Sequence, residues 1–262
     1  MAGKVRAPRY VEGHDLLAGK TVVVTAAAGT GIGFSVATRC IEEGARVLIS
    51  DIHERRVAEA AEALAEVAGE PVPAVLCNVT SEDDVQQLFA TAIEQLGHVD
   101  VLINNAGLGG EVDLVDMTDE QWTTVLDVTL NGTMRCTRAG LRHMIERGTG
   151  VIVNNASVIG WRAQAGQCHY AAAKAGVMAL TRCSAIEAAP HGVRVNAVSP
   201  SLAMHPFLAK TSSDELLAEL AAREAFGRPA EVWEVANTMV FLASDYSSYM
   251  TGEVVSVSSQ HP

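Results

Sequence analysis

The sequence predicts a doubly wound α/β domain, in which helices cover both faces of a seven-stranded parallel sheet. Two observations predict this class. Short runs rich in β-branched residues alternate with longer stretches of helical periodicity, and most of these runs are apolar nearly throughout. Continuous apolarity indicates strands buried on both faces, and the segments between them are long enough for right-handed helical crossovers. A chain of 262 residues fits one such domain.

The expected elements follow one another without a linker, an internal repeat or a low-complexity tract. Strands are expected at residues 21–25, 46–50, 72–76, 99–104, 151–155, 194–198 and 253–257. Helices are expected at residues 33–43, 54–68, 81–96, 118–147, 168–189, 212–225 and 231–244. Ser81 and Thr118 are typical N-cap residues. Pro190 and Gly192 mark the end of the helix expected at residues 168–189. Residues 1–17 are expected to form an extension outside the sheet, and residues 18–262 a single domain.

Composition and charge exclude several classes of protein. With 48% hydrophobic residues, the chain can bury a sizeable core and is not of the disordered class. It carries 19 Lys and Arg against 31 Asp and Glu, a net charge of −12, so its field disfavours nucleic acid and anionic membrane surfaces. No apolar run suits a signal peptide or a membrane span, and the five cysteines lack the close pairs of metal or redox sites. We therefore expect a cytoplasmic protein with reduced core thiols and no metal.

A loop of small residues follows the first expected strand and opens directly into a helix. It runs from residue 25 to residue 33 with the sequence TAAAGTGIG. Small side chains let an anion approach the backbone, and the free N–H groups and dipole at the helix start favour negative charge. This placement indicates a dinucleotide site of the Rossmann type. The candidate contacts are Ala26, Gly29, Thr30, Gly31 and Ile32.

The second expected strand ends at Asp51, 18 residues after the last glycine of this loop. An acid about 20 residues on is the one that receives the adenosine ribose hydroxyls. A carboxylate there would repel a 2′-phosphate, and Thr30 rather than a basic residue stands before Gly31. The sequence therefore favours NAD over NADP, while Arg55 and Arg56 keep NADP open.

A tyrosine and a lysine share one face of the helix expected at 168–189. Tyr170 and Lys174 are four positions apart, so their side chains lie one turn from each other. An ammonium group beside a phenol favours the phenolate, so the pairing is expected to lower the tyrosine pKa from about 10 toward the range useful for proton transfer. Ser157, 13 residues before Tyr170, could hydrogen-bond the same reacting oxygen.

In combination these motifs resemble the short-chain dehydrogenase/reductase family, and the resemblance covers residues 16–258. The residues that carry it are the glycine loop at 25–33, Asp51, Asn104 to Gly107, Ser157, Tyr170, Lys174 and Asn196 to Pro200. The resemblance implies that Tyr170 is the acid/base, that Ser157 polarises the substrate oxygen and that Lys174 also holds the nicotinamide ribose. It implies cofactor contacts from Asn78, Val79, Asn105, Ala106, Gly107, Tyr170, Lys174 and Pro200. It also implies a homo-oligomer, a tetramer or a dimer.

The sequence departs from the family pattern at several of these positions. Ala26 stands where the first glycine of the loop is usual, so Gly29 is expected to supply the positive φ instead. Asn78 replaces an aspartate near the adenine. Thr129 aligns with the catalytic asparagine of the central helix and is the candidate to hold its relay water. Asn131 is two positions farther, which on a helix is a rotation of about 200° onto another face.

A narrower resemblance rests on residues 154–189, with the Trp161 to Gln164 loop, and on the ending at 246–262. These stretches are similar to dehydrogenases of bacterial steroid breakdown that act on a ring hydroxyl of the C/D-ring remnant, carried as a coenzyme A thioester. The candidate substrate residues are Trp161, Met204, Phe207 and Leu208 for an apolar pocket, with Arg162 or His205 for thioester phosphates. Trp161 could instead pack in the core or in an oligomer contact, and lone histidines such as His169 and His205 are expected to be solvated.

The sequence thus predicts an oxidoreductase that interconverts a secondary alcohol and a ketone by hydride transfer with NAD. One alternative is an NADPH-dependent 3-oxoacyl thioester reductase with the same fold, which Asp51 disfavours. Another is a non-catalytic dinucleotide-sensing protein, which Ser157, Tyr170 and Lys174 disfavour. Metal-dependent alcohol dehydrogenase chemistry lacks a Cys/His ligand cluster.

Overall fold

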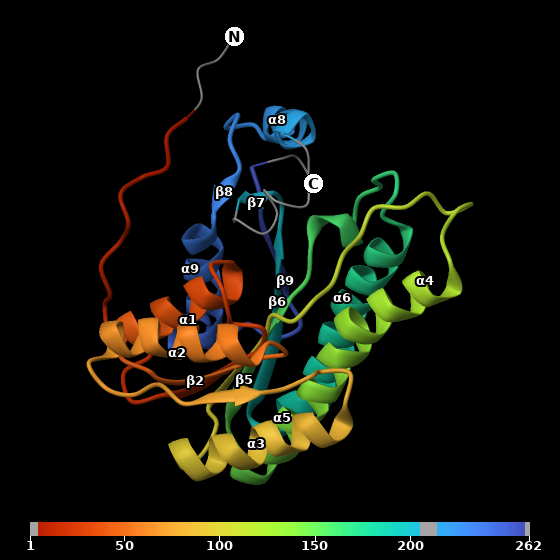
Figure 1. Cartoon of the computed structure of the whole chain (residues 1–262). Coiled ribbons are helices and arrows are strands. Elements are labelled where there is room, and N and C mark those ends of the chain that lie inside the picture. The colour runs from red at the N-terminus through yellow and green to blue at the C-terminus, as the bar shows by residue number, and fades with distance from the viewer. Residues whose placement is uncertain (1–4, 205–213, 260–262) are drawn as a thin grey trace.

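The computed structural model describes residues 5–204 and 214–259, and it confirms the predicted seven-stranded parallel sheet (Figure 1). The strands lie in the order β3-β2-β1-β4-β5-β6-β9. Their bounds are β1 (Thr21–Val24), β2 (Arg46–Asp51), β3 (Ala74–Leu76), β4 (Val101–Asn104), β5 (Gly150–Asn155), β6 (Val193–Pro200) and β9 (Val254–Val257). The order reverses between β1 and β4, so the crevice at their carboxyl ends is the point where ligands bind in such sheets.

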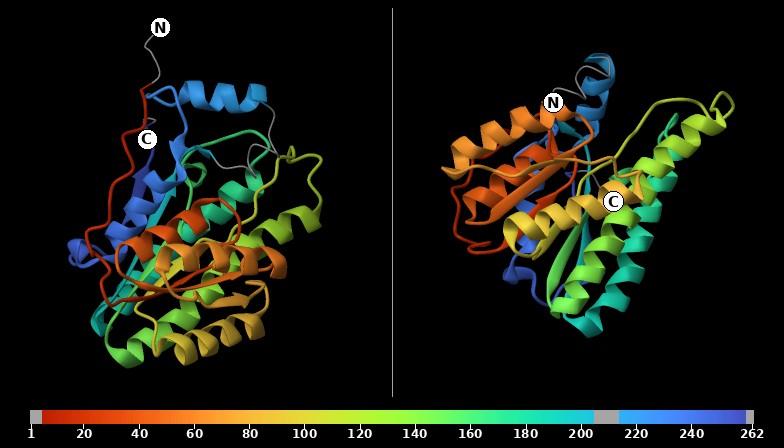
Figure 2. Two further views of the ribbon diagram at one scale, coloured as in Figure 1. Left: turned by 60° about the vertical axis from the view of Figure 1, so that its left-hand side comes forward. Right: turned by 60° about the horizontal axis from the view of Figure 1, so that its bottom comes forward.

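Helices cover both faces of the sheet, as the apolar strands require (Figure 2). One face carries α1 (Ile32–Glu42), α2 (Glu54–Ala68) and α9 (Val232–Ala243), and the other carries α3 (Glu82–Leu96), α5 (Gly132–Arg147) and α6 (Cys168–Ala188). Val22 and Val24 of β1 pack into the first layer and Val23 into the second, and all three are completely buried. Alternate residues of one strand therefore fill two separate cores, which explains why the strand has no polar face.

The helix expected at 118–147 is interrupted, and that expectation is wrong for its middle. The chain forms α4 (Asp119–Leu126), a π-helical turn η1 (Asp127–Asn131) and then α5. The predicted N-cap is confirmed, since Thr118 and Gln121 form a capping box. A π-turn inserts one residue into the helical repeat and shifts the side chains that follow it, a change that hydrophobic periodicity does not reveal.

Short elements link the sheet to the segment that follows β6. A two-stranded parallel ribbon joins β7 (Ala203–Met204) to β8 (Ala230–Glu231), and α8 (Asp214–Arg223) lies between them in sequence. Single 3-10 turns occupy η2 (Val158–Gly160), η3 (Ala189–His191) and η4 (Asp245–Ser247). In Figure 1, α8 and the ribbon stand beyond the carboxyl ends of β6 and β9.

The cysteines divide into two groups, and the expectation that all five are core thiols is wrong for two of them. Cys40, Cys77 and Cys136 are buried, whereas Cys168 and Cys183 of α6 are exposed, and all five are free. Burial in apolar surroundings raises the pKa of the Cys40 thiol to about 12. Among the residues described, no helix combines the length and the apolarity needed to cross a membrane.

Candidate functional site

The glycine loop lies between the carboxyl end of β1 and the start of α1. Two of its residues have positive φ, Ala26 at 51° and Gly29 at 88°. The expectation that Gly29 replaces Ala26 in this conformation is therefore wrong in part, because the alanine adopts it as well. Gly31 caps α1 without a side-chain hydrogen bond, which leaves the first N–H groups of the helix available for an anion. Thr30 and Ile32 flank this cap.

The absence of a side chain at Gly33 lets the start of α1 pack closely against Ala26 and Asn105. A Cβ atom on Gly33 would lie 2.4 Å from both the Ala26 carbonyl oxygen and Asn105 Nδ2. Only glycine permits this approach, so the glycine here serves close packing rather than a turn.

Asp51 ends β2 and lies beside the glycine loop. Its carboxylate accepts hydrogen bonds from the backbone N–H of Ala28 at 3.3 Å and of His53 at 3.0 Å, and Arg56 Nη2 lies 3.8 Å away. Burial raises the pKa of this carboxyl above its usual value, opposed by the Ala28 hydrogen bond and by the Arg56 charge. Arg56 is thus oriented toward the carboxylate, while Arg55 pairs with Glu59.

Asn105 and Ala106 fasten the glycine loop to β4, a supporting role that the sequence did not indicate. The Asn105 amide donates to the carbonyl oxygens of Thr25 at 3.2 Å and Ala26 at 2.9 Å. The Thr25 hydroxyl accepts from the backbone N–H of Asn105 at 3.0 Å and of Ala106 at 3.2 Å. Asn105 Oδ1 in turn accepts from Asn155 Nδ2 at 3.0 Å, which joins β4 to β5. Thr25 and Asn155 are supporting residues of the candidate site that sequence reasoning missed, although both stand at strand ends.

Asn78 and Val79 lie after β3 at the same edge. Asn78 Oδ1 accepts from the N–H and the hydroxyl of Thr80 at 3.1 and 2.9 Å, so its acceptor is engaged within its own turn. Val79 is buried, and a Cβ on Gly132 would lie 2.6 Å from its Cγ2. Pro200 ends β6 at this edge.

Ser157, Tyr170 and Lys174 come together beside this crevice. The Ser157 side chain hydrogen-bonds the Tyr170 side chain. Lys174 Nζ lies 5.5 Å from the centroid of the Tyr170 ring and donates to the Asn155 carbonyl oxygen at 2.5 Å. Lys174 is 3% exposed. The helical spacing therefore places the pair as predicted, and the Asn155 carbonyl is the additional partner of the ammonium group.

In the chain without cofactor, burial determines the pKa values of Tyr170 and Lys174. The expectation that the Lys174 ammonium lowers the Tyr170 pKa is therefore wrong for this state. Burial raises the pKa of Tyr170 to about 12, opposed by the Ser157 hydrogen bond. Burial lowers the pKa of Lys174 to about 8. The ammonium is aimed at the Asn155 carbonyl and lies over the phenol ring rather than on its hydroxyl, so it does not offset the cost of burying a phenolate.

Thr129 lies in the π-turn and holds the loop that follows β4. Its hydroxyl donates to the Leu108 carbonyl oxygen and accepts from the Leu108 N–H, both at 3.0 Å, and the side chain is fully buried. A Cβ on Gly107 would lie 3.4 Å from Lys174 Nζ and 3.8 Å from Thr129 Oγ1. Asn131 donates instead to Asp127 Oδ1 at 3.0 Å, as its expected rotation away from the site requires.

His169 is buried beside the catalytic candidates, so the expectation that it is solvated is wrong. It is 1% exposed, and its Nδ1 accepts the backbone N–H of Tyr170 at 2.9 Å. That bond requires the proton on Nε2 when the ring is neutral. Nε2 faces Gly110, where a Cβ would lie 3.3 Å away.

The structure describes only part of the expected substrate pocket. Trp161 follows η2 with its side chain 45% exposed, Arg162 comes next, and Met204 ends β7 half-buried. Phe207, Leu208 and His205 lie outside the described residues.

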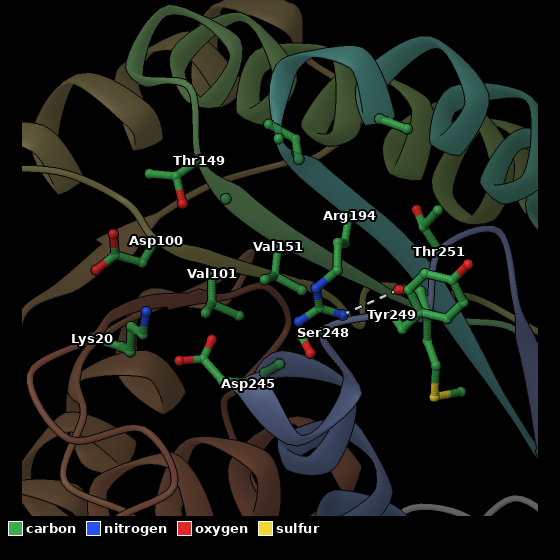
Figure 3. Close-up of a pocket in the computed structure, with 16 residues that line it drawn as sticks. Lys20, Asp100, Val101, Thr149, Val151, Arg194, Asp245, Ser248, Tyr249 and Thr251 are labelled. Carbon is green, nitrogen blue, oxygen red and sulfur yellow. Dashed lines mark hydrogen bonds between the residues drawn. The ribbon is translucent and has the colours of Figure 1, made fainter.

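A cavity of about 530 Å³ lies at the amino edge of the sheet (Figure 3). Val101, Val151 and Val193 at the amino ends of three strands line it, together with Lys20 and Arg194. The Arg194 guanidinium donates to the carbonyl oxygens of residues 242, 244 and 250 and to the hydroxyl of residue 247, at 3.0 to 3.3 Å. These bonds join the loop after α9 to the sheet and indicate a structural role for this guanidinium.

Buried polar atoms at the carboxyl edge fit a bound dinucleotide. Within the described part of the chain, the buried side-chain atoms that lack a hydrogen-bond partner include four at the ends of β2, β4, β5 and β6. These are Ser50 Oγ, Asn104 Oδ1, Asn155 Oδ1 and Ser199 Oγ. Unpaired polar groups are costly, so their concentration at one edge beside an uncapped helix start is consistent with a polar ligand. In the same residues, no group of three or more His, Cys, Asp or Glu could hold a metal.

Comparison with known proteins gives the same family for nearly the whole chain. Residues 26–259 match the family model described as enoyl-(acyl carrier protein) reductase. The chain is 62% identical over 257 residues, 98% of both chains, to "(5R,7aS)-5-hydroxy-7a-methyl-1-oxo-2,3,5,6,7,7a-hexahydro-1H-indene-carboxyl-CoA reductase" of Mycobacterium tuberculosis. It is 37% identical to the 3-oxoacyl-[acyl-carrier-protein] reductase FabG of Thermotoga maritima, over 92% of this chain and 97% of that one.

A solved structure of similar fold also belongs to this group. It is the crystal structure of a short chain dehydrogenase from Mycobacterium smegmatis, with a TM-score of 0.88 and 58% identity over 98% of this chain and 99% of that chain. The resemblance found in the sequence is therefore confirmed. The chain is an oxidoreductase that acts on CH–OH groups, and it belongs to the short-chain dehydrogenase/reductase family, which uses NAD(P) cofactors.

Proposed function

We propose that the chain interconverts a secondary ring alcohol and a ketone with NAD, on a bicyclic C/D-ring remnant of a steroid carried as a coenzyme A thioester. The observation that carries the reaction type is the cluster of Ser157, Tyr170 and Lys174 at the carboxyl edge beside the glycine loop. The substrate class is supported by the 62% identity to the indene-carboxyl-CoA reductase over nearly the whole of both chains.

Tyr170 is the proposed acid/base of this reaction. The bound nicotinamide ring supplies the hydride acceptor for the carbinol carbon, and the hydride donor in the reverse direction. In the reduction the Tyr170 O–H bond breaks and its proton passes to the ketone oxygen, which leaves a phenolate. In the oxidation the same phenolate takes the proton of the alcohol O–H and becomes a phenol again. Ser157, already hydrogen-bonded to Tyr170, orients the same reacting oxygen. Positioned acid/base catalysis of this kind contributes about 10²- to 10⁴-fold.

Lys174 and Thr129 support the acid/base in different ways. Lys174, held by the Asn155 carbonyl, provides a positive charge over the Tyr170 ring and is placed to bind the nicotinamide ribose. Thr129 holds Leu108, and a Cβ on the next residue, Gly109, would lie 3.6 Å from Tyr170 Cδ2. Thr129 thus acts as a positioning residue for the loop over the phenol.

The cofactor contacts are proposed to favour NAD. The Asp51 carboxylate would accept the adenosine ribose hydroxyls and repel a 2′-phosphate, and Arg56 is oriented toward Asp51. Pyrophosphate would lie at Ala26, Gly29, Thr30, Gly31 and Ile32, with Asn78, Val79, Asn105, Ala106, Gly107 and Pro200 along the adenine and nicotinamide sides.

The substrate contacts, the assembly and the location extend the same proposal. Trp161, Met204 and Phe207 would contact the rings, and Arg162 the thioester phosphates. We further propose a cytoplasmic homo-oligomer, a tetramer or a dimer, with no metal, membrane or nucleic-acid partner.

Reduction of 3-oxoacyl thioesters with NADPH is the second candidate, and the 37% identity to FabG favours it. One substrate panel separates the two. The purified chain should oxidise the hydroxy-indene carboxyl-CoA with NAD at a kcat/KM at least about tenfold above its value for a linear 3-hydroxyacyl-CoA. A preference for the linear thioester with NADP would reverse the assignment, and the absence of turnover with either would reject both.

A further inference from the structure

The N-terminal residues 5–16 form an extended segment, here termed the strap, that runs across one helical layer toward α8 (Figure 2). No strand of the sheet includes it. It contacts the end of α1, the start of α9 and the turn after α8 through hydrogen bonds and ring contacts. The strap therefore connects α1, which follows the glycine loop, with α8 and β8, which lie on the proposed substrate side. The proposed reaction does not itself require this connection.

The first contact joins the strap to a buried ion pair at the end of α1. Arg39 Nη2 lies 2.6 Å from Glu43 Oε1, and both side chains are at most 4% exposed. Glu43 Oε2 accepts the backbone N–H groups of His14 at 2.7 Å and Leu16 at 3.0 Å, and Arg39 donates to the Val11 carbonyl oxygen at 2.7 Å. Buried charges are costly unless they are hydrogen-bonded, so the strap stabilises this pair, although Arg39 Nε has no partner among the described residues.

The second contact places an aromatic ring between α1 and α9. Tyr10 meets the Trp233 ring edge to face, with centroids 5.5 Å apart, and the Arg39 guanidinium lies 5.2 Å from the Tyr10 centroid. The Tyr10 hydroxyl donates to Glu42 at 2.5 Å. A Cβ on Gly13 would lie 2.1 Å from the Glu42 carbonyl oxygen, so the strap approaches α1 too closely for any side chain at that position.

The third contact holds the turn between α8 and β8. The Val5 N–H donates to the Phe226 carbonyl oxygen at 3.1 Å, and the Val5 carbonyl accepts from Arg228 Nε at 3.0 Å. Arg228 also forms a two-point ion pair with Glu234 of α9, at 2.7 and 2.8 Å. Gly227 has a φ of 63°, which permits the sharp turn at this point. Both main-chain groups of Val5 therefore bind the residues that carry α8 back to the sheet.

This turn leads directly to the ribbon beyond β6. The Ala230 N–H donates to the Leu202 carbonyl oxygen at 2.8 Å, and β8 pairs with β7, where Met204 is a proposed substrate contact. The turn thus lies between Val5 and the end of β6. A displacement of residues 226–231 would be transmitted to β7 through these backbone bonds.

We propose that the strap is a positioning element for the substrate. By holding residues 226–228 against α9, it fixes the β7–β8 ribbon and α8, and so determines how tightly a large ring substrate is held. It contacts neither the groups proposed for proton transfer nor the glycine loop. The substrate part of this proposal rests on the proposed function, whereas the restraint on residues 226–231 does not.

Hydrogen exchange of the free chain tests the restraint without any turnover. Val5→Pro removes the N–H that binds Phe226, and Val5→Ala is the matched control because it keeps both main-chain bonds. A deletion of residues 2–9 removes all Val5 contacts and retains Tyr10. Exchange at residues 225–231 is expected to accelerate about tenfold in the proline and deletion variants and to stay at the wild-type rate in Val5→Ala. Unchanged exchange in the deletion variant would overturn the proposal.

Steady-state kinetics with the same variants test the consequence for the substrate. For the largest ring alcohol that the wild-type chain oxidises, the deletion is expected to raise KM about five- to tenfold while kcat stays within about twofold. The dissociation constant of NAD should not change. An accelerated exchange with an unchanged KM would show that the strap holds the turn but does not position substrate, which would also overturn the proposal. If the wild type oxidises no ring alcohol, the proposed function fails while the exchange result still stands.

Discussion

The two edges of the sheet use buried polar groups in opposite ways. At the amino edge, the Arg194 guanidinium donates to four acceptors, and Asp100 accepts from Thr21, His98 and Arg147. At the carboxyl edge, Asn155 Oδ1 and three further buried side-chain atoms have no hydrogen-bond partner among the residues described, and the Lys174 ammonium donates to the Asn155 carbonyl oxygen. A cavity is present at the amino edge, yet the chemistry fits the other.

The comparison teaches that unused hydrogen-bonding capacity, rather than cavity size, distinguishes the site. Saturated charges fix loops and stabilise the fold, whereas unsaturated ones cost stability and persist where a ligand or a reaction uses them. Substitutions at the amino edge should therefore lower the stability with little effect on kcat. Substitutions at the carboxyl edge should lower kcat or cofactor affinity more than they lower the stability.

Replacement of Arg194 by Met should give the largest loss of stability. It removes four hydrogen bonds from a charged donor that join the loop after α9 to the sheet, so the free energy of unfolding should fall by about 3 kcal/mol. Denaturant titration measures this loss, and kcat measured well below the melting temperature should stay within about twofold. Lys20→Met, in the same cavity, is the control and should change stability by less than about 0.5 kcal/mol. A large drop in kcat for fully folded Arg194→Met would contradict the conclusion that the amino edge serves stability rather than the reaction.

Replacement of Lys174 by Met should separate activity from stability at the other edge. Burial lowers the folded-state pKa of Lys174 to about 8 from 10.5. Between these values only the unfolded chain holds the proton, so wild-type stability should rise with pH by at most about 3 kcal/mol relative to Lys174→Met. Denaturant titrations of both chains, without cofactor, between pH 7 and the upper limit of the window measure the difference. Parallel pH profiles of the two chains would contradict the buried charge. The variant should also lose most of its kcat.

Asp51 gives the next largest effect, on the choice of cofactor. Asp51→Asn keeps an acceptor for the Ala28 N–H and removes the charge. Asp51→Ser removes the charge and both carboxylate oxygens. We expect the ratio of NAD to NADP affinity to fall about 100-fold in the serine variant and less in the asparagine variant. Titration of each cofactor measures the ratio. An unchanged ratio in both variants would place the adenosine ribose elsewhere.

Thr129 should give the smallest effect, on the loop over Tyr170. Thr129→Val loses both hydrogen bonds to Leu108, whereas Thr129→Ser keeps the hydroxyl. We expect kcat to fall about tenfold in the valine variant and to recover in the serine variant, with the melting temperature of the two similar. Equal losses in both variants would point to packing of the methyl group instead.

The fold could be predicted from the sequence because most of the β-strands are apolar on both faces, and a parallel sheet covered by helices is the arrangement that buries them. Val22 and Val23 illustrate this, since they enter different cores. Helical spacing likewise predicted that Tyr170 and Lys174 would share a face. These features are local in sequence, and so the sequence reveals them.

The features that the sequence could not reveal depend on contacts between distant elements. The π-turn at Thr129 is stabilised by the loop after β4, and periodicity contains no record of that partner. The Asn155 carbonyl and the Thr25 hydroxyl act through their place at strand ends, which holds no distinctive residue pattern. The pKa of Tyr170 depends mainly on burial, which raises it. The helical spacing indicated the neighbouring ammonium group but not this burial.

The most direct test of the carboxyl edge as the reacting site is the kcat of Tyr170→Phe beside that of Tyr246→Phe, a matched change at an exposed tyrosine. The variants are compared with NAD and the alcohol that the wild type oxidises fastest, after equal cofactor affinity has been measured by titration. We predict that Tyr170→Phe loses about 10²- to 10⁴-fold in kcat and that Tyr246→Phe matches the wild type. Turnover of Tyr170→Phe at the level of Tyr246→Phe would contradict the role of Tyr170 as the acid/base.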